Sequence, residues 1–369
     1  MKLLTIVGAR PQFIKEALLS AEITKQKEYI ETLVHIGQHY DENMSDVFFR
    51  ELNMKEPDYN LGVSGGSHAS MTARIMEALE AVLERENPDL ALVFGDTNST
   101  LAGALTAVKM HIPLCHVESG VRTGFLTNPE EINRLCADHI ASINCAVTPK
   151  GLENLKRENL GRSSVLCGDL MLDAYKKYAP FSKNKSLSFL GLDNNEVTLP
   201  TNYYYLTCHR EENSNLKAVS EILLAMEELD YPAVYPVHPR MIQFVRTASD
   251  DYKLSNTLLI QPTGYIESLC LMEGSAKVIT DSGGIQREAF FAEKKCVTLL
   301  PFSASEELLS GNRNTLLETI TKDSILSALQ QPQTINPSFT PFGKGEAAKE
   351  IVDAIGRFFS GKEITCNSH

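Results

Sequence analysis

Short β-branched runs alternate with amphipathic helical stretches along most of the chain, and this alternation constrains the fold more than any other feature. In the stretch 66–87, for example, apolar residues such as Met71, Ile75 and Leu79 recur at the spacing of one helix face. The predicted order in the first half is strand 2–7, a helix after Pro11, strand 33–36, helix 66–87, strand 89–94, helix 99–109, strand 113–117 and helix 129–140. Such alternation predicts βαβ units and a parallel sheet covered on both faces.

A second series of the same kind follows residues 168–200, whose Lys, Ser, Asn and Pro show little periodicity and predict a connector. The predicted order there is strand 203–207, helix 216–229, strands 233–237 and 257–260, helix 266–276, strand 277–280, helix 284–293 and strand 296–300. We therefore predict an α/β fold of two Rossmann-like, doubly wound domains facing a central cleft. The predicted domains are residues 1–170 and 171–346, with the C-terminal segment 347–369, including a helix over 347–359, joining the first.

Composition narrows the class of protein. The chain has 369 residues, which suits two domains, and a formal net charge of −12. That excess of acid argues against nucleic-acid binding, which depends on clustered Lys and Arg. Apolar stretches such as 2–8 and 90–94 are far shorter than the roughly 20 residues of a membrane span, and neither a membrane partner nor a secretory signal is expected. The eight cysteines form no Cys-x-x-Cys pair, which favours buried free thiols in a reducing cytoplasm.

The turn from the first strand into the first helix carries groups suited to an anionic ligand. It reads Gly8-Ala9-Arg10-Pro11-Gln12-Phe13-Ile14-Lys15. Backbone N–H groups at a helix start attract anions, and Arg10 and Lys15 would add positive charge on the same side. A tight turn with a solvated Arg and Lys is an equally good interpretation of this segment alone.

A second turn of this type leads from strand 277–280 into the next helix. Ser282 can offer a hydroxyl and an N–H to a phosphate, and Gly283 and Gly284 permit close approach. Glu288 lies one turn into the helix, within reach of a ribose. The alternative is that Asp281 and Ser282 only cap the helix. Neither a Gly-x-Gly-x-x-Gly nor a P-loop motif is present, so a nicotinamide cofactor or ATPase activity is not expected.

Three acids follow strands or start a helix in the first half of the chain. Asp96 comes after strand 89–94, Glu118 after strand 113–117, and Glu130 begins helix 129–140. Gathered at one edge of a parallel sheet, they could raise each other's pKa and serve as acid and base. Taken singly, each has a simpler explanation: a turn residue, an ion-pair partner, or an i,i+4 partner of Arg134.

Histidines follow two strands of the second half. His209-Arg210 and His238-Pro239-Arg240 stand at strand ends, where a His-Arg pair suits a phosphate or a proton transfer. A single His there is more often structural. The spacing of His35 and His39 does not place two rings on one helix face, so no metal site is predicted.

Together these segments closely resemble the non-hydrolysing UDP-N-acetylglucosamine 2-epimerase family. The matching segments, in the family's order, are GARPQFIK, GQHYDENM, VFGDTNSTLAGALTA, HVESGVRTG, NPEEINR, the His-Arg of TCHREEN, PVHPR and TDSGGIQREA. GARPQFIK and GQHYDENMSD look most like the branch that acts on UDP-2,3-diacetamido-2,3-dideoxyglucuronate. The resemblance implies two Rossmann-like domains in the GT-B arrangement of many nucleotide-sugar glycosyltransferases.

The resemblance also implies an isomerase that inverts C2 of a UDP-N-acetylhexosamine with no cofactor and no metal, in a cytoplasmic homodimer that serves polysaccharide biosynthesis. UDP would leave C1 while a base takes the C2 proton, giving a 2-acetamidoglucal to which UDP adds back. By resemblance, the catalytic residues are Asp96, Glu118, Glu130, His209 and Lys15. The residues that hold UDP are Arg10, Ser282, Gly283, Gly284 and Glu288, with Glu288 on the ribose.

Three departures from the family pattern keep other functions open. The stretch 301–307 lacks the basic residue that relatives place there, and the loop before Pro129 is about two residues short. The segment with Gln38 and His39 differs from the activator-binding Gln-His-x-Gln of some relatives. The alternatives are a hydrolysing 2-epimerase, a GT-B glycosyltransferase, and an inactive nucleotide-sugar-binding regulator, which the missing basic residue favours.

Overall fold

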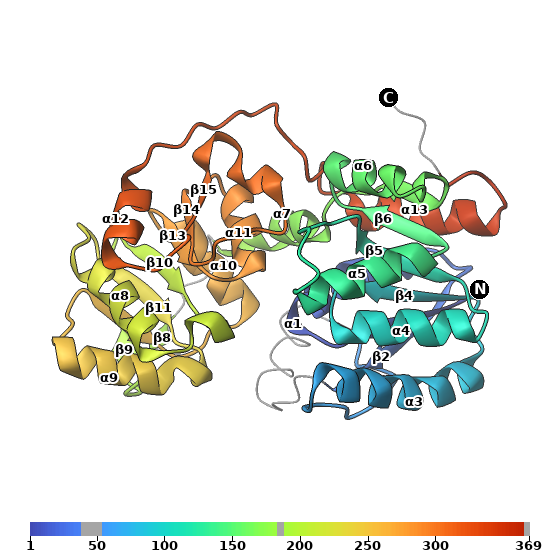
Figure 1. Ribbon diagram of the computed structural model, residues 1–369, viewed down its shortest axis with the longest axis horizontal. Coiled ribbons are helices and arrows are strands. Elements are labelled where there is room, and N and C mark those ends of the chain that lie inside the picture. Colours follow the sequence, from blue (N-terminus) through green and yellow to red (C-terminus); the bar gives the residue numbers. More distant parts are fainter. Residues whose placement is uncertain (38–53, 183–187, 365–369) are drawn as a thin grey trace. The chain divides into compact units, whose positions relative to one another are not determined.

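The computed structural model describes residues 1–37, 54–182 and 188–364, except for the side chains of Arg10, Phe181 and Ser182. The chain divides into two compact units, Met1–Ala174 with Thr340–His369, and Tyr175–Phe339. Each unit is built around a parallel sheet with helices packed on it (Figure 1). The predicted α/β class with two Rossmann-like domains is confirmed. Among the described residues, no helix has the length and apolar content to cross a membrane.

The first domain contains a seven-stranded parallel sheet in the order β3-β2-β1-β4-β5-β6-β7. Its strands are β1 (Lys2–Val7), β2 (Ile30–His35), β3 (Tyr59–Asn60), β4 (Leu90–Phe94), β5 (Leu114–Ser119), β6 (Ile143–Ala146) and β7 (Ser164–Leu166). Its helices are α1 (Arg10–Ile23), α3 (His68–Glu86), α4 (Asn98–Lys109), α5 (Pro129–Ile140), α6 (Pro149–Arg157), η1 (Gly161–Ser163) and α13 (Ala347–Phe359). The strand order reverses between β1 and β4, which is the switch point at which doubly wound sheets bind ligands.

Helices α3, α4 and α5 lie side by side along the first sheet (Figure 1). At Gly103 of α4 a Cβ atom would come within 2.9 Å of the Ile6 side chain, so this helix lies unusually close to the strands. The C-terminal helix α13 packs against α1 and β6. Its buried residues Ile351, Val352 and Ile355 share one face, which is why a segment far along the chain belongs to this domain.

The second domain contains a six-stranded parallel sheet in the order β12-β11-β10-β13-β14-β15. Its strands are β10 (Tyr204–Thr207), β11 (Ala233–Pro236), β12 (Thr257–Ile260), β13 (Val278–Thr280), β14 (Cys296–Thr298) and β15 (Asn314–Leu316), beside a small antiparallel pair, β8 (Phe189–Leu190) and β9 (Glu196–Val197). Its helices are η2 (Glu211–Asn213), α8 (Leu216–Glu227), η3 (Pro239–Met241), α9 (Ile242–Tyr252), α10 (Tyr265–Gly274), α11 (Gly283–Phe291), η4 (Glu306–Asn312) and α12 (Lys322–Gln330). Here the strand order reverses between β10 and β13.

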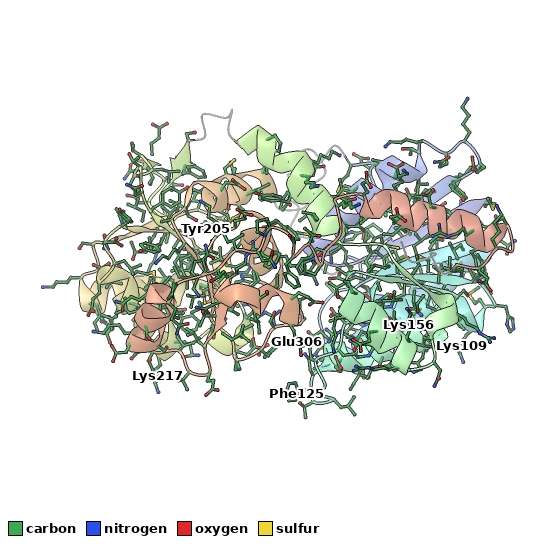
Figure 2. All side chains as sticks on the ribbon, turned by 90° about the horizontal axis from the view of Figure 1, so that it is seen from above. Lys109, Phe125, Lys156, Tyr205, Lys217 and Glu306 are labelled. Carbon is green, nitrogen blue, oxygen red and sulfur yellow. The ribbon has the colours of Figure 1, made fainter. Side chains whose placement is uncertain are left out.

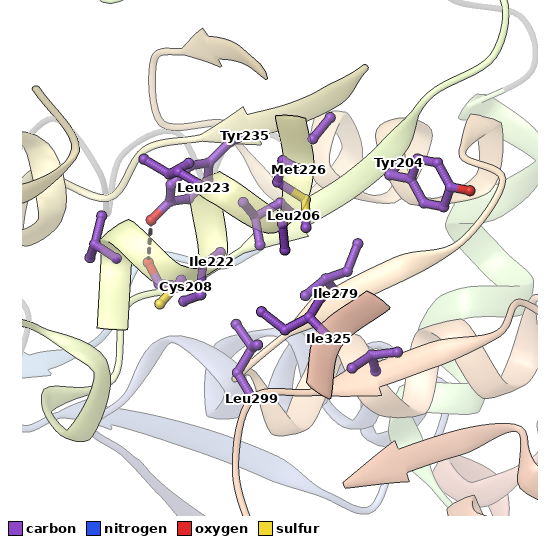
Figure 3. Close-up of a cluster of buried hydrophobic side chains, with 14 of the residues drawn as sticks. Tyr204, Leu206, Cys208, Ile222, Leu223, Met226, Tyr235, Ile279, Leu299 and Ile325 are labelled. Atoms are coloured by element: carbon purple, nitrogen blue, oxygen red, sulfur yellow. Dashed lines mark hydrogen bonds between the residues drawn. The ribbon is translucent and has the colours of Figure 1, made fainter. Parts of the chain in front are cut away.

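Apolar side chains fill the space between the second sheet and its helices. Leu206, Ile222, Leu223 and Ile279 are among the members of this cluster (Figure 3). Tyr235 belongs to it and donates its hydroxyl to the Cys208 carbonyl oxygen at 2.9 Å. Charged residues such as Lys217 project outward from the same domain, whereas the ring of Tyr205 lies inside it (Figure 2).

The predicted connector over 168–200 is wrong for part of its length. Residues Leu170–Ser182 form helix α7, and β8 and β9 follow within the same stretch. The helical period is present in the buried residues Met171, Ala174 and Tyr178. It is hidden in the sequence by adjacent lysines and by Pro180, which lies inside the helix. The described cysteines are all free thiols, and most are buried, as predicted; Cys136 is exposed.

Candidate functional site

Glu118 occupies a strained turn at the end of β5. Its φ is +71°, a backbone conformation that non-glycine residues adopt rarely and at a cost of about 1–3 kcal/mol. The register of β5 against β6 shifts between Val117 and Ser119, so an irregularity in the strand turns the Glu118 side chain. Gly95, which follows β4, lies alongside: a Cβ atom there would be 3.3 Å from Glu118 Oε2. The ends of β4 and β5 therefore bring Asp96 and Glu118 to the same edge of the sheet.

Lys15 reaches this edge from helix α1 and forms an ion pair with Glu118. The Lys15 side chain is 9% exposed and that of Glu118 is 12% exposed. Two groups so shielded from water interact more strongly than a surface pair. The structure thus brings together Lys15 and Glu118, two of the residues that the family resemblance implies for catalysis.

Asp96 is held by Arg134, whose guanidinium contacts the carboxylates of both Asp96 and Glu131. Burial opposes the charge of Arg134, but the attraction of Asp96 and Glu131 outweighs it and raises the pKa of Arg134. Asn133 adds a hydrogen bond of 2.9 Å from Nδ2 to the Asp96 carbonyl oxygen. Asp96 and Glu118 are therefore each in contact with a cationic side chain.

Glu130 differs from its neighbour Glu131. Its side chain is exposed in the first turn of α5, and no hydrogen bond to its carboxylate occurs within the described part of the chain. Glu131 is buried; burial opposes its charge, but N–H groups of Thr123 and Gly124 donate to it and lower its pKa. The simpler explanation of Glu130 as the partner of Arg134 is wrong, because the i,i+3 residue Glu131 takes that place.

Gln12, which the sequence alone did not indicate as a site residue, links the turn after β1 to the end of β4. Gln12 Oε1 accepts from the Gly8 N–H at 2.7 Å, and its Nε2 donates to the Phe94 carbonyl oxygen at 2.6 Å. Its place one turn before Lys15 in GARPQFIK was the available signal. The side chain of Arg10 lies outside the described residues, as do Gln38 and His39.

In the second domain, Asp281 organises the switch point. Its carboxylate is fully buried, and Oδ2 accepts from the backbone N–H groups of His209 and Arg210, both at 2.8 Å. Asn213 Nδ2 donates to the same oxygen at 3.2 Å. The other oxygen, Oδ1, lies 3.3 Å from His209 Nδ1. Capping of the helix was one of the two interpretations of this turn; in the structure the Asp281 carboxylate connects the end of β13 to the loop after β10.

His209 itself stands at the rim of this network. Its side chain is 41% exposed, and its ring stacks on that of His238 with 5.7 Å between centroids. Asp281 thus holds the backbone of His209 through its Oδ2 and lies beside the ring of His209 through its Oδ1. An Asp-oriented imidazole at a strand end can exchange protons or bind an anion.

Helix α11 begins with an open backbone. Ser282 caps the helix by accepting from the Ile285 N–H. A Cβ atom at Gly283 would meet nothing within 4 Å, and one at Gly284 would meet only the Ser282 hydroxyl. Glu288 is buried further along the same helix. The unhindered N–H groups and the helix dipole make this terminus suitable for a phosphate.

The stretch 301–307, which lacks the expected basic residue, is fixed by polar contacts instead. Ser303 donates its hydroxyl to Gln286 Oε1 of α11 at 3.2 Å. Asn314 Nδ2 donates to the same oxygen at 3.2 Å. Among the described residues, no group of three or more His, Cys, Asp or Glu is arranged to hold a metal ion.

Two Rossmann-like domains, one with carboxylates at its switch-point edge and one with an open helix start, define an α/β enzyme suited to a nucleotide ligand. The family model described as UDP-N-acetylglucosamine 2-epimerase matches residues 21–356. The chain is 37% identical to the UDP-2,3-diacetamido-2,3-dideoxy-D-glucuronate 2-epimerase of Pseudomonas aeruginosa, over 97% of this chain and all of that protein. It is 31% identical to the UDP-N-acetylglucosamine 2-epimerase of Escherichia coli, over 96% and 98% of the two chains.

Solved structures agree with these sequence relatives. The UDP-GlcNAc 2-epimerase of Methanocaldococcus jannaschii, in complex with UDP-GlcNAc and UDP, has a TM-score of 0.85 at 32% identity, over 96% of this chain and 99% of that chain. The chain therefore belongs to the UDP-N-acetylglucosamine 2-epimerase family. It is an epimerase, and hence an isomerase, and the resemblance inferred from its motifs is confirmed.

Proposed function

We propose that the chain inverts C2 of a UDP-N-acetylhexosamine, or of its 2,3-diacetamido uronate analogue, without hydrolysis. The C2 hydrogen is not next to a carbonyl group, so direct removal by a side chain is unfavourable. Breaking the C1–O bond sends an electron pair out with UDP while a base takes the C2 proton, and a C1=C2 double bond forms. Delivery of a proton to the opposite face of C2 and return of the UDP oxygen to C1 complete the inversion.

The observation that carries this proposal is the pair of carboxylates at adjacent strand ends in the first domain. Asp96 contacts Arg134 and Glu118 contacts Lys15, so each proposed acid–base group lies beside a positively charged side chain. The exposed carboxylate of Glu130 is the third proposed acid. Two distinct acid–base groups are needed, because the proton leaves one face of C2 and arrives at the other.

The proposed UDP site lies at the start of α11 in the second domain. Ser282, Gly283 and Gly284 would hold the diphosphate, Glu288 the ribose, and His209 would act beside the leaving group, with Arg10 as a further cation. This assignment is supported by the open N–H groups of the two glycines and by the family's motif. The relative from M. jannaschii was solved in complex with UDP-GlcNAc and UDP. We further propose that the enzyme works as a cytoplasmic homodimer, as the family resemblance implies.

Isotope incorporation tests the reaction directly. The chain is incubated in D2O with a panel of UDP-N-acetylhexosamines and their 2,3-diacetamido uronates, followed by proton NMR. We expect deuterium at C2 of both epimers while UDP remains attached to the sugar. The panel also identifies the sugar, since only an accepted substrate exchanges.

Each alternative gives a different result in the same experiment. Free epimerised sugar with stoichiometric UDP would assign the hydrolysing reaction instead. Turnover only with an added acceptor, and no deuterium at C2, would assign a glycosyltransferase. Binding of UDP-sugar with no exchange in any member of the panel would leave a regulator, the function that the missing basic residue at 301–307 favours.

A further inference from the structure

His116 and Asp138 form a buried charged pair that the proposed chemistry does not use. His116 precedes Glu118 by two residues on β5, and Asp138 lies in α5; both side chains are completely buried. Nδ1 of His116 is 2.6 Å from Asp138 Oδ1, and its Nε2 is 2.7 Å from the carbonyl oxygen of Gly95. Both ring nitrogens are therefore engaged.

The partners define the protonation state of the ring. A carbonyl oxygen only accepts, so Nε2 must carry a hydrogen. Asp138 Oδ2 accepts from Arg122 Nη1 at 2.6 Å and from the Gly120 N–H at 3.1 Å, as expected for a carboxylate. A carboxylate also requires a hydrogen on Nδ1. With both nitrogens protonated, the ring is an imidazolium.

The charges around the ring agree with this assignment. Burial opposes the charge, but the hydrogen bond and charge of Asp138 outweigh it and raise the pKa of His116; Gly95 and Asp96 act in the same direction. Arg122 contacts Asp138 and is itself paired with Glu158, and the Cys145 thiol of β6 is a further titratable group that interacts with the ring.

We propose that His116 is a positioning residue that fixes the spacing of the two carboxylates at the first sheet edge; this role rests on the proposed function. Its Nε2–H holds the carbonyl of Gly95, the residue before Asp96. Its partner Asp138 holds the N–H of Gly120, two residues after Glu118. One buried ion pair thus clamps the turns after β4 and β5 from behind, where the backbone of Gly95 and Glu118 has positive φ.

Protonation can be measured without any substrate. Long-range ¹H–¹⁵N correlation of the full-length enzyme reports the state of each histidine ring, and loss of one signal in His116→Gln assigns His116. We expect the imidazolium pattern for His116 from pH 6 to pH 8. A neutral ring at pH 7 would overturn the proposal. Because this measurement needs no turnover, it stands even if the panel in D2O shows the proposed function to be wrong.

Two variants test the positioning role. His116→Phe keeps a ring but loses both hydrogen bonds, and we expect kcat to fall by about 10²-fold, the scale of a misplacement of about 1 Å. His116→Gln can still donate to Gly95, so we expect a smaller loss, of about tenfold. KM and UDP binding should stay within a factor of about three. His139→Gln, at an exposed histidine of α5 beside Asp138 in the sequence, is the matched control and should keep wild-type kcat.

Other outcomes would contradict the proposal. Equal loss of kcat, UDP affinity and melting temperature in both variants would assign His116 a purely structural role. Disappearance of one limb of the kcat–pH profile in His116→Gln would make the ring a titrating acid or base rather than a fixed clamp. Unchanged kcat in both variants would show that the spacing does not depend on His116.

Discussion

The switch-point edges of the two domains use carboxylates in opposite ways. At the first, Asp96 contacts Arg134 and Glu118 contacts Lys15, and the Asp96 side chain remains 35% exposed. At the second, Asp281 is completely buried and accepts from backbone and side-chain N–H groups. Both sheets are parallel. In each domain, the candidate residues come directly after the strands between which the strand order reverses, or after a strand next to these.

The two edges differ in the groups that contact their carboxylates. At the second edge, Oδ2 of Asp281 accepts from two backbone N–H groups and from Asn213, which fixes the carboxylate against the loop after β10. At the first edge, the carboxylates of Asp96 and Glu118 contact the long cationic side chains of Arg134 and Lys15. In the proposed function, the first edge transfers protons at the sugar, and the second positions His209 and the N–H groups of α11.

Glu118→Gln tests the first edge and should have the largest effect. The amide has nearly the shape of the carboxylate but cannot accept the C2 proton, and it leaves Lys15 without its partner. We expect kcat to fall about 10³-fold, within the range measured for acid–base residues. The rate of deuterium incorporation at C2 is the readout.

The control for Glu118→Gln is Glu153→Gln, at an exposed glutamate of α6 whose partners are Lys150 and Arg157. It should leave the rate unchanged. Wild-type turnover in Glu118→Gln would exclude Glu118 from proton transfer and remove the main difference between the two edges.

Asp281→Asn tests the second edge. The amide oxygen can still accept from the N–H groups of His209 and Arg210, but it is a neutral acceptor, and the NH2 group takes the place of the oxygen that faces His209 Nδ1. We expect kcat to fall about 10²-fold through displacement of His209, and the free energy of unfolding to fall by about 1–3 kcal/mol because hydrogen bonds to a charged acceptor are replaced by weaker ones. Steady-state kinetics and urea unfolding measure the two effects.

Asp251→Asn, at an exposed position of α9, is the matched control. Full activity together with lower stability in Asp281→Asn would show that Asp281 only supports the fold. Unchanged stability would contradict the network of backbone donors around its carboxylate.

The first edge was easier to predict from the sequence than the second. Asp96 and Glu118 stand directly after apolar strands, and parallel strands bring such residues to one edge. Helix α5 and strand β12 were predicted with their observed bounds, because caps and apolar runs mark them. The family motif added Lys15, which the structure places against Glu118.

The partners of these residues were not predictable from spacing. Arg134 pairs with Asp96 across 38 positions, and Asp281 pairs with the backbone at His209 across 72. Such contacts depend on which strands become neighbours, and β10 lies beside β13 only in the folded sheet. The positive φ of Glu118 is likewise imposed by the irregular register of β5 against β6 and leaves no trace in local propensity.

Gly283→Ala separates ligand binding from folding at the second edge. A Cβ atom at this position meets nothing within 4 Å, so the melting temperature should not change. If the diphosphate lies against these N–H groups, the added methyl group should weaken UDP binding about tenfold, or by about 1.4 kcal/mol. Isothermal calorimetry with UDP is the measurement. Gly356→Ala in α13 is the matched helical control. If both variants bind UDP with equal affinity, the diphosphate does not lie at the start of α11.

We expect the smallest effect from a third site in the first domain, the buried carboxyl group of Glu16. Glu16 of α1 is buried, and burial, together with the charge of Glu31, raises its pKa well above 4.5. Unlike Asp96 and Glu118, it has no cation in direct contact among the described residues; Lys55 acts on it only through its more distant charge. This acid therefore opposes folding when it must ionise.

The sign of its pH dependence follows from the raised pKa. Below pH 4.5 the carboxyl is protonated in both the folded and the unfolded chain, so its titration does not lower the free energy of unfolding. As the pH rises, the unfolded chain loses this proton first, so the folded state becomes progressively less stable up to the folded pKa. Glu16→Gln removes the titration, and we expect it to raise the melting temperature by about 2–4 °C at pH 7, with a difference that shrinks toward pH 4. Glu80→Gln, at an exposed glutamate of α3, should leave the melting temperature unchanged at both pH 7 and pH 4. If the melting temperature of the wild type instead rose relative to that of Glu16→Gln as the pH increased, Glu16 would be stabilised as an anion, and the raised pKa would be wrong.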